Sequence, residues 1–142
     1  AASDVYKRQV RDLAQMELCY APPYNSAKSP VNMMGFIASN LLDGLVPTVY
    51  AESIPKECAV LDVRTPQEFA AGHIDGSFNI PLDELRDRLS ELPQGRPLAV
   101  TCAVGLRGYL AVRILLAHGF DARNLSGGFR MYTLTKKAGL IK

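Results

Sequence analysis

The chain has 142 residues, 48% of them hydrophobic, which is enough for one compact α/β core and too little for two full domains. A net charge of +2 with 21% charged residues gives no clustered basic face, so we expect no nucleic-acid partner. No apolar run approaches the about 20 residues that cross a bilayer, and the amino end shows no secretory pattern, so we expect no membrane partner.

Three cysteines, Cys19, Cys58 and Cys102, are an odd number without a CxxC pair or a Cys/His metal spacing. The sequence therefore predicts free thiols, with neither a disulfide framework nor a metal site. Free thiols are typical of the reducing cytosol, so we expect a cytoplasmic protein. Cys58 starts an apolar strand without a basic neighbour in the sequence, and Cys19 precedes a Pro-rich turn, so we interpret both as packing residues.

Residues 1–47 differ in composition from the rest and contain no complete α/β unit. An irregular leader with the Pro-rich turn Tyr20–Tyr24 precedes a predicted helix that starts at Pro30, has Ser29 as its N-cap and ends at Gly44. Its apolar stripe is Val31, Met34, Ile37, Ala38 and Leu41. One amphipathic helix cannot bury its own apolar face, so it must dock on the rest of the chain, a second copy or another domain.

Residues 48–142 alternate strands with helices. The first predicted strand is Ala59–Val63, followed by a helix from Pro66 with a capping box of Thr65 and Glu68. A second strand, Ser77–Ile80, precedes an apolar stripe that predicts another helix, formed by Leu82, Leu85, Leu89 and Leu92.

The third predicted strand, Leu98–Thr101, is apolar enough to be central and runs directly into Cys102. A helix over Gly108–His118, a strand over Ala122–Leu125 and a helix opened by Gly127 and Gly128 complete the chain. This alternation predicts right-handed crossovers and a parallel sheet with helices on both faces.

The segment from Cys102 to Gly108 carries the strongest chemical signal. Ligands bind outside the carboxyl ends of strands in open α/β sheets, and Cys102 stands at such an end, before a helix N-terminus. Gly105 and Gly108 allow a sharp turn with inward N–H groups, and Arg107 adds a permanent charge. These features favour an anion at the mouth of the loop, first the Cys102 thiolate and then the terminal sulfur of a persulfide.

Cysteine phosphatases and arsenate reductases also combine a cysteine, a short loop and an arginine, but the phosphatase loop is one residue longer. Here four residues separate Cys102 from Arg107: Ala103, Val104, Gly105 and Leu106. The tighter ring suits a single sulfur atom better than a tetrahedral phosphate. A phosphatase also needs a general acid, and no Asp or Glu lies in or just after this loop. Sulfur transfer needs none, because a thiolate leaves readily.

The loop side chains Ala103, Val104 and Leu106 are apolar, and Arg107 is its one charged residue. A loop that collects a small dianion such as thiosulfate would benefit from more positive charge. We therefore expect a preference for larger or less charged donors and acceptors, such as the persulfide of a small thiol, a coenzyme thiol or a partner protein's cysteine.

Four stretches in order resemble the rhodanese domain: Leu61–Phe69, Gly72–Pro81, the Cys102–Arg107 loop and Leu125–Gly128. The resemblance implies a mainly parallel five-stranded sheet and a sulfurtransferase. Cys102 would be the nucleophile that forms a persulfide, and Ala103, Val104, Gly105, Leu106, Arg107 and Gly108 would form the substrate cradle.

Other residues of these stretches are interpreted as scaffold. Asp62 and Arg64 follow a strand end and are expected to form a turn and an ion pair. Glu68 is expected to cap its helix. His73 is expected to make a hydrogen bond in a turn, because a thiolate needs no general base.

A second resemblance covers Leu18–Gly35, which looks like the end of the dimerisation domain of flavin-dependent pyridine nucleotide–disulfide oxidoreductases, nearest to coenzyme A disulfide reductases and NADH oxidases. Some of these carry a rhodanese domain at their C-terminus. By this resemblance, residues 1–47 are the tail of a dimerisation domain and residues 48–142 are the rhodanese domain. Residues 1–9 match neither pattern, and a non-native leader is one interpretation of them. Tyr20 and Tyr24 would lie near a partner active site, or simply pack the turn.

This resemblance implies FAD and NAD(P)H only for a reductase portion, because the chain lacks the Gly-x-Gly-x-x-Gly unit and itself needs no cofactor. The partners implied are small thiols or persulfides, a flavoprotein cysteine, and a second copy of the chain through the N-terminal helix. The competing hypothesis is a catalytically silent rhodanese-fold binding or regulatory module. Inactive versions commonly lose the nucleophile, and Cys102 and Arg107 are both present.

Overall fold

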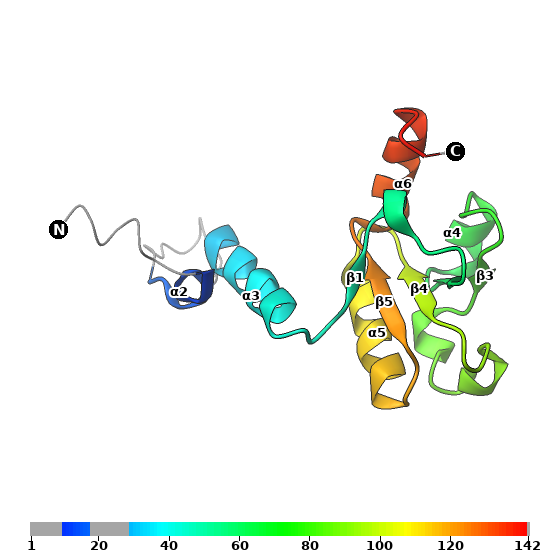
Figure 1. Cartoon of the computed structure of the whole chain (residues 1–142), viewed down its shortest axis with the longest axis horizontal. Coiled ribbons are helices and arrows are strands. Elements are labelled where there is room, and N and C mark those ends of the chain that lie inside the picture. The colour runs from blue at the N-terminus through cyan, green and yellow to red at the C-terminus, as the bar shows by residue number, and fades with distance from the viewer. Residues whose placement is uncertain (1–9, 18–28, 142) are drawn as a thin grey trace. The chain divides into compact units, whose positions relative to one another are not determined.

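The computed structural model describes residues 10–17 and 29–141. The chain divides into two compact units, Ala1–Leu45 and Val46–Lys142, which are described separately (Figure 1). Among the described residues, no helix combines the length and apolar character needed to span a membrane.

The described part of the first unit contains two helices in contact, α2 (Val10–Gln15) and α3 (Pro30–Leu42). Helix α3 begins as predicted, with a capping box between Ser29 and Asn32. The buried Asn32 amide also donates to the carbonyls of Leu13 at 3.1 Å and Met16 at 2.8 Å, at the end of α2. The prediction of a wholly irregular leader is therefore wrong for α2. Cys19, Tyr20 and Tyr24 lie outside the described residues.

Three of the five residues of the apolar stripe of α3 are not covered by α2. Gly35 faces α2, since a Cβ there would stand 2.3 Å from the Ala14 backbone nitrogen. Met34, Ile37 and Leu41 remain exposed. The two helices thus meet at a small residue, Gly35, and a polar one, Asn32, and the docking of the apolar stripe stays a prediction.

The second unit is built on a five-stranded parallel sheet of order β1-β5-β4-β2-β3 (Figure 1). Its strands are β1 (Thr48–Val49), β2 (Ala59–Asp62), β3 (Phe78–Asn79), β4 (Leu98–Thr101) and β5 (Ala122–Leu125). Strand β4 is central and buried along its length, as its apolar composition predicts.

Alternate residues of β4 point to two separate cores. Leu98 and Val100 belong to a large cluster that includes α5 (Leu106–Ala117). Ala99 belongs to a smaller cluster on the other face, to which Phe129 of α6 (Gly128–Lys137) contributes. Helices therefore cover both faces, as predicted. The remaining elements are η1 (Ala51–Ser53), α4 (Pro66–Ala70), η2 (Leu82–Glu84) and η3 (Leu89–Glu91).

The leucine stripe after β3 forms two 3₁₀ turns, η2 and η3, and the predicted helix there is wrong. Leu85 and Leu92 are nevertheless buried in the large core. A spacing of three residues places side chains on one face of a 3₁₀ turn as well as of an α-helix, so the pattern could not separate the two.

Candidate active site

Cys102 follows the carboxyl end of the central strand β4, where a ligand site is expected in a parallel sheet. The residue is only 1% exposed. Its thiol therefore lies on the floor of the loop and not at the mouth, which corrects the sequence-based placement. The adjoining sheet positions are tightly packed, since Thr101 and its β2 partner Asp62 are both completely buried.

The loop after Cys102 turns back on the sulfur. The Gly105 N–H donates to Cys102 Sγ at 3.1 Å. Gly105 has φ +121°, a conformation that disfavours a side chain, and it is the N-cap residue of α5. No side chain caps α5 by a hydrogen bond. The positive end of the helix therefore meets the sulfur through the backbone.

Helix α6 holds the outer side of the loop. The Phe129 N–H donates to the Cys102 carbonyl at 2.7 Å, and the Arg130 N–H donates to the Ala103 carbonyl at 3.1 Å. In a trans peptide the N–H points opposite to the C=O. The N–H groups of Ala103 and Val104 are therefore directed away from α6.

A third loop carbonyl is held from β5. The Asn124 side-chain amide donates to the Gly105 carbonyl at 3.3 Å, and the Tyr109 N–H donates to the same oxygen at 2.9 Å. Three loop carbonyls thus accept hydrogen bonds from groups outside the loop, which fixes the direction of the intervening N–H donors.

Gly128 allows α6 to approach this closely. A Cβ at this position would stand 2.4 Å from the Cys102 carbonyl oxygen and 2.9 Å from the Ala103 carbonyl. Gly128 also has φ +60°, in the left-handed region.

Gly108 serves packing rather than the sharp turn predicted for it. It is buried within α5 and has no positive φ. A Cβ there would stand 2.3 Å from the Asn124 Oδ1 atom. Gly108 therefore lets α5 pack on the Asn124 side chain, whose amide holds the loop.

Arg107 is not a free positive charge. Its guanidinium donates to both carboxylate oxygens of Glu68, each at 2.7 Å. This hydrogen-bonded pairing lowers the pKa of Glu68 from 4.5 to about 2 and raises the pKa of Arg107. Glu68 also makes the predicted capping box with Thr65. One carboxylate thus joins α4 to the loop, a role that the sequence interpretation did not assign.

The remaining loop side chains face solvent. Val104 is 60% exposed and Leu106 is 70% exposed, while Ala103 is partly buried. The rim of the site is therefore apolar, and its arginine is neutralised by a carboxylate.

Behind the loop lies a buried ion pair. Arg64 donates to both carboxylate oxygens of Asp62, with the shortest distance 2.7 Å, and to the Gly72 carbonyl. The Arg64 guanidinium also stacks 4.3 Å from the centre of the Phe129 ring. The backbone N–H of the same Phe129 donates to the Cys102 carbonyl. The Asp62–Arg64 pair, predicted as scaffold, is therefore connected to the loop through Phe129. His73 Nδ1–H donates a hydrogen bond to the Phe69 carbonyl at 3.1 Å, as expected of a turn residue.

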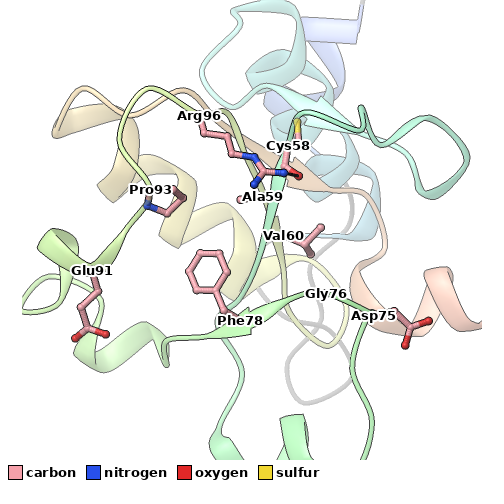
Figure 2. Close-up of a pocket in the computed structure, with 9 residues that line it drawn as sticks. All are labelled: Cys58, Ala59, Val60, Asp75, Gly76, Phe78, Glu91, Pro93 and Arg96. Atoms are coloured by element: carbon pink, nitrogen blue, oxygen red, sulfur yellow. Dashed lines mark hydrogen bonds between the residues drawn. The ribbon is translucent and has the colours of Figure 1, made fainter.

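Cys58 lies immediately before β2, at the amino end of that strand, whereas Cys102 follows the carboxyl end of β4. It borders a pocket of about 440 Å³ together with Phe78, Glu91 and Arg96 (Figure 2). Figure 2 shows Arg96 beside the Cys58 backbone, where its guanidinium donates to the Cys58 carbonyl at 3.3 Å. The thiol thus has a basic neighbour that the sequence did not reveal. Burial nevertheless raises the pKa of the Cys58 thiol, which keeps it protonated and suits a packing role.

The family profile of the rhodanese-like domain matches residues 46–134, more than half of the chain. The chain belongs to the rhodanese-like domain family. The resemblance and the five-stranded parallel fold predicted from the sequence are therefore confirmed.

Two individual relatives are similar to about half of this chain. The chain is 36% identical to YqhL of Bacillus subtilis over 78 residues, 54% of this chain and 62% of that protein. It is 36% identical to the thiosulfate sulfurtransferase GlpE of Shewanella oneidensis over 75 residues, 52% of this chain and 74% of that protein.

Two solved structures match nearly the whole chain, including the part before the rhodanese-like domain. The reduced CoADR-RHD of Bacillus anthracis is 46% identical with a TM-score of 0.86, covering 96% of this chain and 25% of that one. The NAD-dependent persulfide reductase of A. fulgidus is 35% identical with a TM-score of 0.77, covering 92% of this chain and 24% of that one. The chain thus spans about a quarter of these proteins.

The sequence predicts Cys102 as the nucleophile and its loop as the cradle, but it does not reveal the groups that hold the loop in the structure. These are Glu68 as the Arg107 partner, the Asn124 amide and the backbone N–H groups at the start of α6. The Gly127-Gly128 pair was a usable signal, because two glycines at a helix start indicate a close backbone approach. No local pattern marked Asn124.

Proposed function

We propose that this rhodanese-like domain is a sulfurtransferase that carries sulfane sulfur as a persulfide on Cys102. The observation that supports it best is the Gly105 N–H directed at Cys102 Sγ, at an uncapped helix N-terminus. The same donor and the loop N–H groups suit the terminal sulfur of a persulfide. An S–S bond of about 2 Å would carry that atom from the floor of the loop toward its mouth.

The reaction proceeds in two balanced displacements. The Cys102 thiolate attacks the outer sulfur of a donor R–S–S⁻, a new S–S bond forms, and R–S⁻ leaves with the electron pair of the broken bond. An acceptor thiolate then attacks the terminal sulfur, and Cys102 leaves as a thiolate. Neither step needs an oxidant, a metal or a general acid, because thiolates serve as nucleophile and as leaving group.

The donor we propose is a persulfide or polysulfide of a small thiol, a coenzyme thiol or a protein cysteine. The exposed apolar Val104 and Leu106 and the paired Arg107 support this choice. Relatives named thiosulfate sulfurtransferase make thiosulfate the natural comparison. Turnover with thiosulfate clearly above that with glutathione persulfide would contradict the choice.

We further propose that the domain works with an NAD(P)H-dependent persulfide or coenzyme A disulfide reductase. The matches to CoADR-RHD and to a persulfide reductase, each about four times longer than this chain, support this context. Cys102 would pass its sulfur to a flavoprotein cysteine. The exposed stripe of α3 would pair with a second copy in a homodimer, or with the reductase portion. FAD and NAD(P)H binding is assigned to that portion, because this sequence has no Gly-x-Gly-x-x-Gly unit.

The test is intact-mass spectrometry after incubation with glutathione persulfide, before and after reduction. The expected result is a reducible gain of one sulfur atom, mapped to Cys102. Cys102→Ala should abolish both the adduct and sulfur transfer to cyanide, and Cys58→Ala should retain both. Equal transfer by wild type and Cys102→Ala would refute the mechanism. No transfer by wild type would favour the binding-module alternative.

A further inference from the structure

The Glu68 carboxylate lies between a helix cap and the loop that follows Cys102. Its Oε2 atom accepts hydrogen bonds from the Thr65 N–H at 3.1 Å and the Thr65 hydroxyl at 3.2 Å. Both of its oxygens also accept from Arg107. The α4 cap therefore fixes the carboxylate, and the carboxylate in turn fixes the guanidinium in a bidentate pair.

This pairing removes the net charge of the loop. Arg107 is the one charged residue between Cys102 and Gly108, and Glu68 neutralises it. The buried Arg64 behind the loop is likewise paired with Asp62. Arg130, on the first turn of α6, is a further positive charge beside the loop, and it is exposed. It is the same in wild type and in every variant compared, so it does not contribute to the difference between them.

We propose that Glu68 sets the charge selectivity of the sulfur donor by keeping Arg107 paired. With the pair intact, the loop favours a donor whose reacting end carries at most one negative charge over the thiosulfate dianion. Glu68 acts through Arg107, so it is a positioning residue and not a catalytic one. This inference rests on the proposed sulfurtransferase function and names the residue that controls donor choice.

Glu68→Gln isolates the charge. Glutamine at this position can still complete a capping box, so α4 keeps its N-terminal hydrogen bonds. The loss of the carboxylate leaves one net positive charge at the loop. The two donors differ by one negative charge, so a new unit charge about 6 Å away changes the ratio of their kcat/KM values. Coulomb's law gives a change of roughly threefold in bulk water and roughly a hundredfold at an effective dielectric constant of about 20. We expect a change on the order of tenfold.

The experiment compares kcat/KM for thiosulfate with kcat/KM for the persulfide of 2-mercaptoethanol, which carries at most one negative charge. In Glu68→Gln the ratio should rise on the order of tenfold toward thiosulfate, and added salt should reduce the rise. The ratio cancels any loss of folded protein. Adding Arg107→Gln to this variant should abolish the rise, because the released charge is then gone.

Glu91→Gln is the matched control. Glu91 forms a bidentate pair with Arg88 at 2.7 and 2.8 Å, so this variant makes the same change in net charge outside the loop. Its donor ratio should equal that of wild type. An unchanged ratio in Glu68→Gln, or an equal rise in Glu91→Gln, would overturn the inference while leaving the proposed function intact. Absence of transfer from both donors in wild type would overturn both.

Discussion

Replacing Gly128 with alanine tests whether the amino end of α6 holds the active-site loop. The new Cβ would stand 2.4 Å from the Cys102 carbonyl oxygen, so α6 must move away. Two hydrogen bonds, from Phe129 and Arg130, would then be lost, each worth about 0.5–1.5 kcal/mol. Alanine in the left-handed region adds about 1–2 kcal/mol. We expect Gly128→Ala to lower the free energy of unfolding by about 2–5 kcal/mol.

Urea unfolding of the full chain measures this loss, and Gly95→Ala separates its two parts. Gly95 has φ +70°, and a Cβ there would meet no atom within 4 Å, so alanine carries the backbone strain without a clash. We expect Gly95→Ala to cost about 1–2 kcal/mol and to leave persulfide formation unchanged, while Gly128→Ala also reduces the persulfide yield on Cys102. Equal losses of stability in the two variants, with equal persulfide yields, would refute the role assigned to α6.

Three further outcomes are expected. Asp62→Ala leaves the buried Arg64 charge unpaired and should lower the free energy of unfolding by about 3–5 kcal/mol in urea titration, and a loss below about 1 kcal/mol would contradict the buried pair. Because the folded-state pKa of Glu68 is lowered from 4.5 to about 2, its stabilisation is complete above pH 4.5 and is lost as pH falls toward 2. The melting temperature of Glu68→Gln should therefore approach that of wild type across this window, and a constant difference would contradict the pairing. Because burial raises the Cys58 pKa, iodoacetamide at neutral pH should modify Cys58 only after unfolding, and peptide mapping of native protein with a labelled Cys58 would contradict this.

Features set by neighbouring residues were predictable from the sequence. The Thr65–Glu68 capping box, the Ser29 cap of α3 and the central strand β4 all follow from local composition and spacing. The position of Cys102 at a strand end was predictable for the same reason, because the strand, the loop and the helix start are contiguous. The leucine stripe after β3 was ambiguous, since its spacing fits two kinds of helix.

Features that depend on residues far apart in the sequence were not predictable in this way. Glu68 and Arg107 are 39 positions apart and meet because β2 and β4 are neighbours in the sheet. The Asn124 amide reaches the Gly105 carbonyl from β5 across 19 positions. The pairing that neutralises the loop charge is therefore a property of the topology and not of the loop sequence.

The hydrogen bonds from α6 to the loop also have a consequence for the order in which the site is made. A ribosome synthesises Cys102 before β5 and α6, whose Asn124, Phe129 and Arg130 hold the carbonyls of the loop. A nascent chain that ends before α6 therefore carries Cys102 without the donors that shape its surroundings. We expect the sulfur-carrying chemistry proposed for the Cys102 thiol only after α6 docks, so that an unfinished chain should not load sulfur.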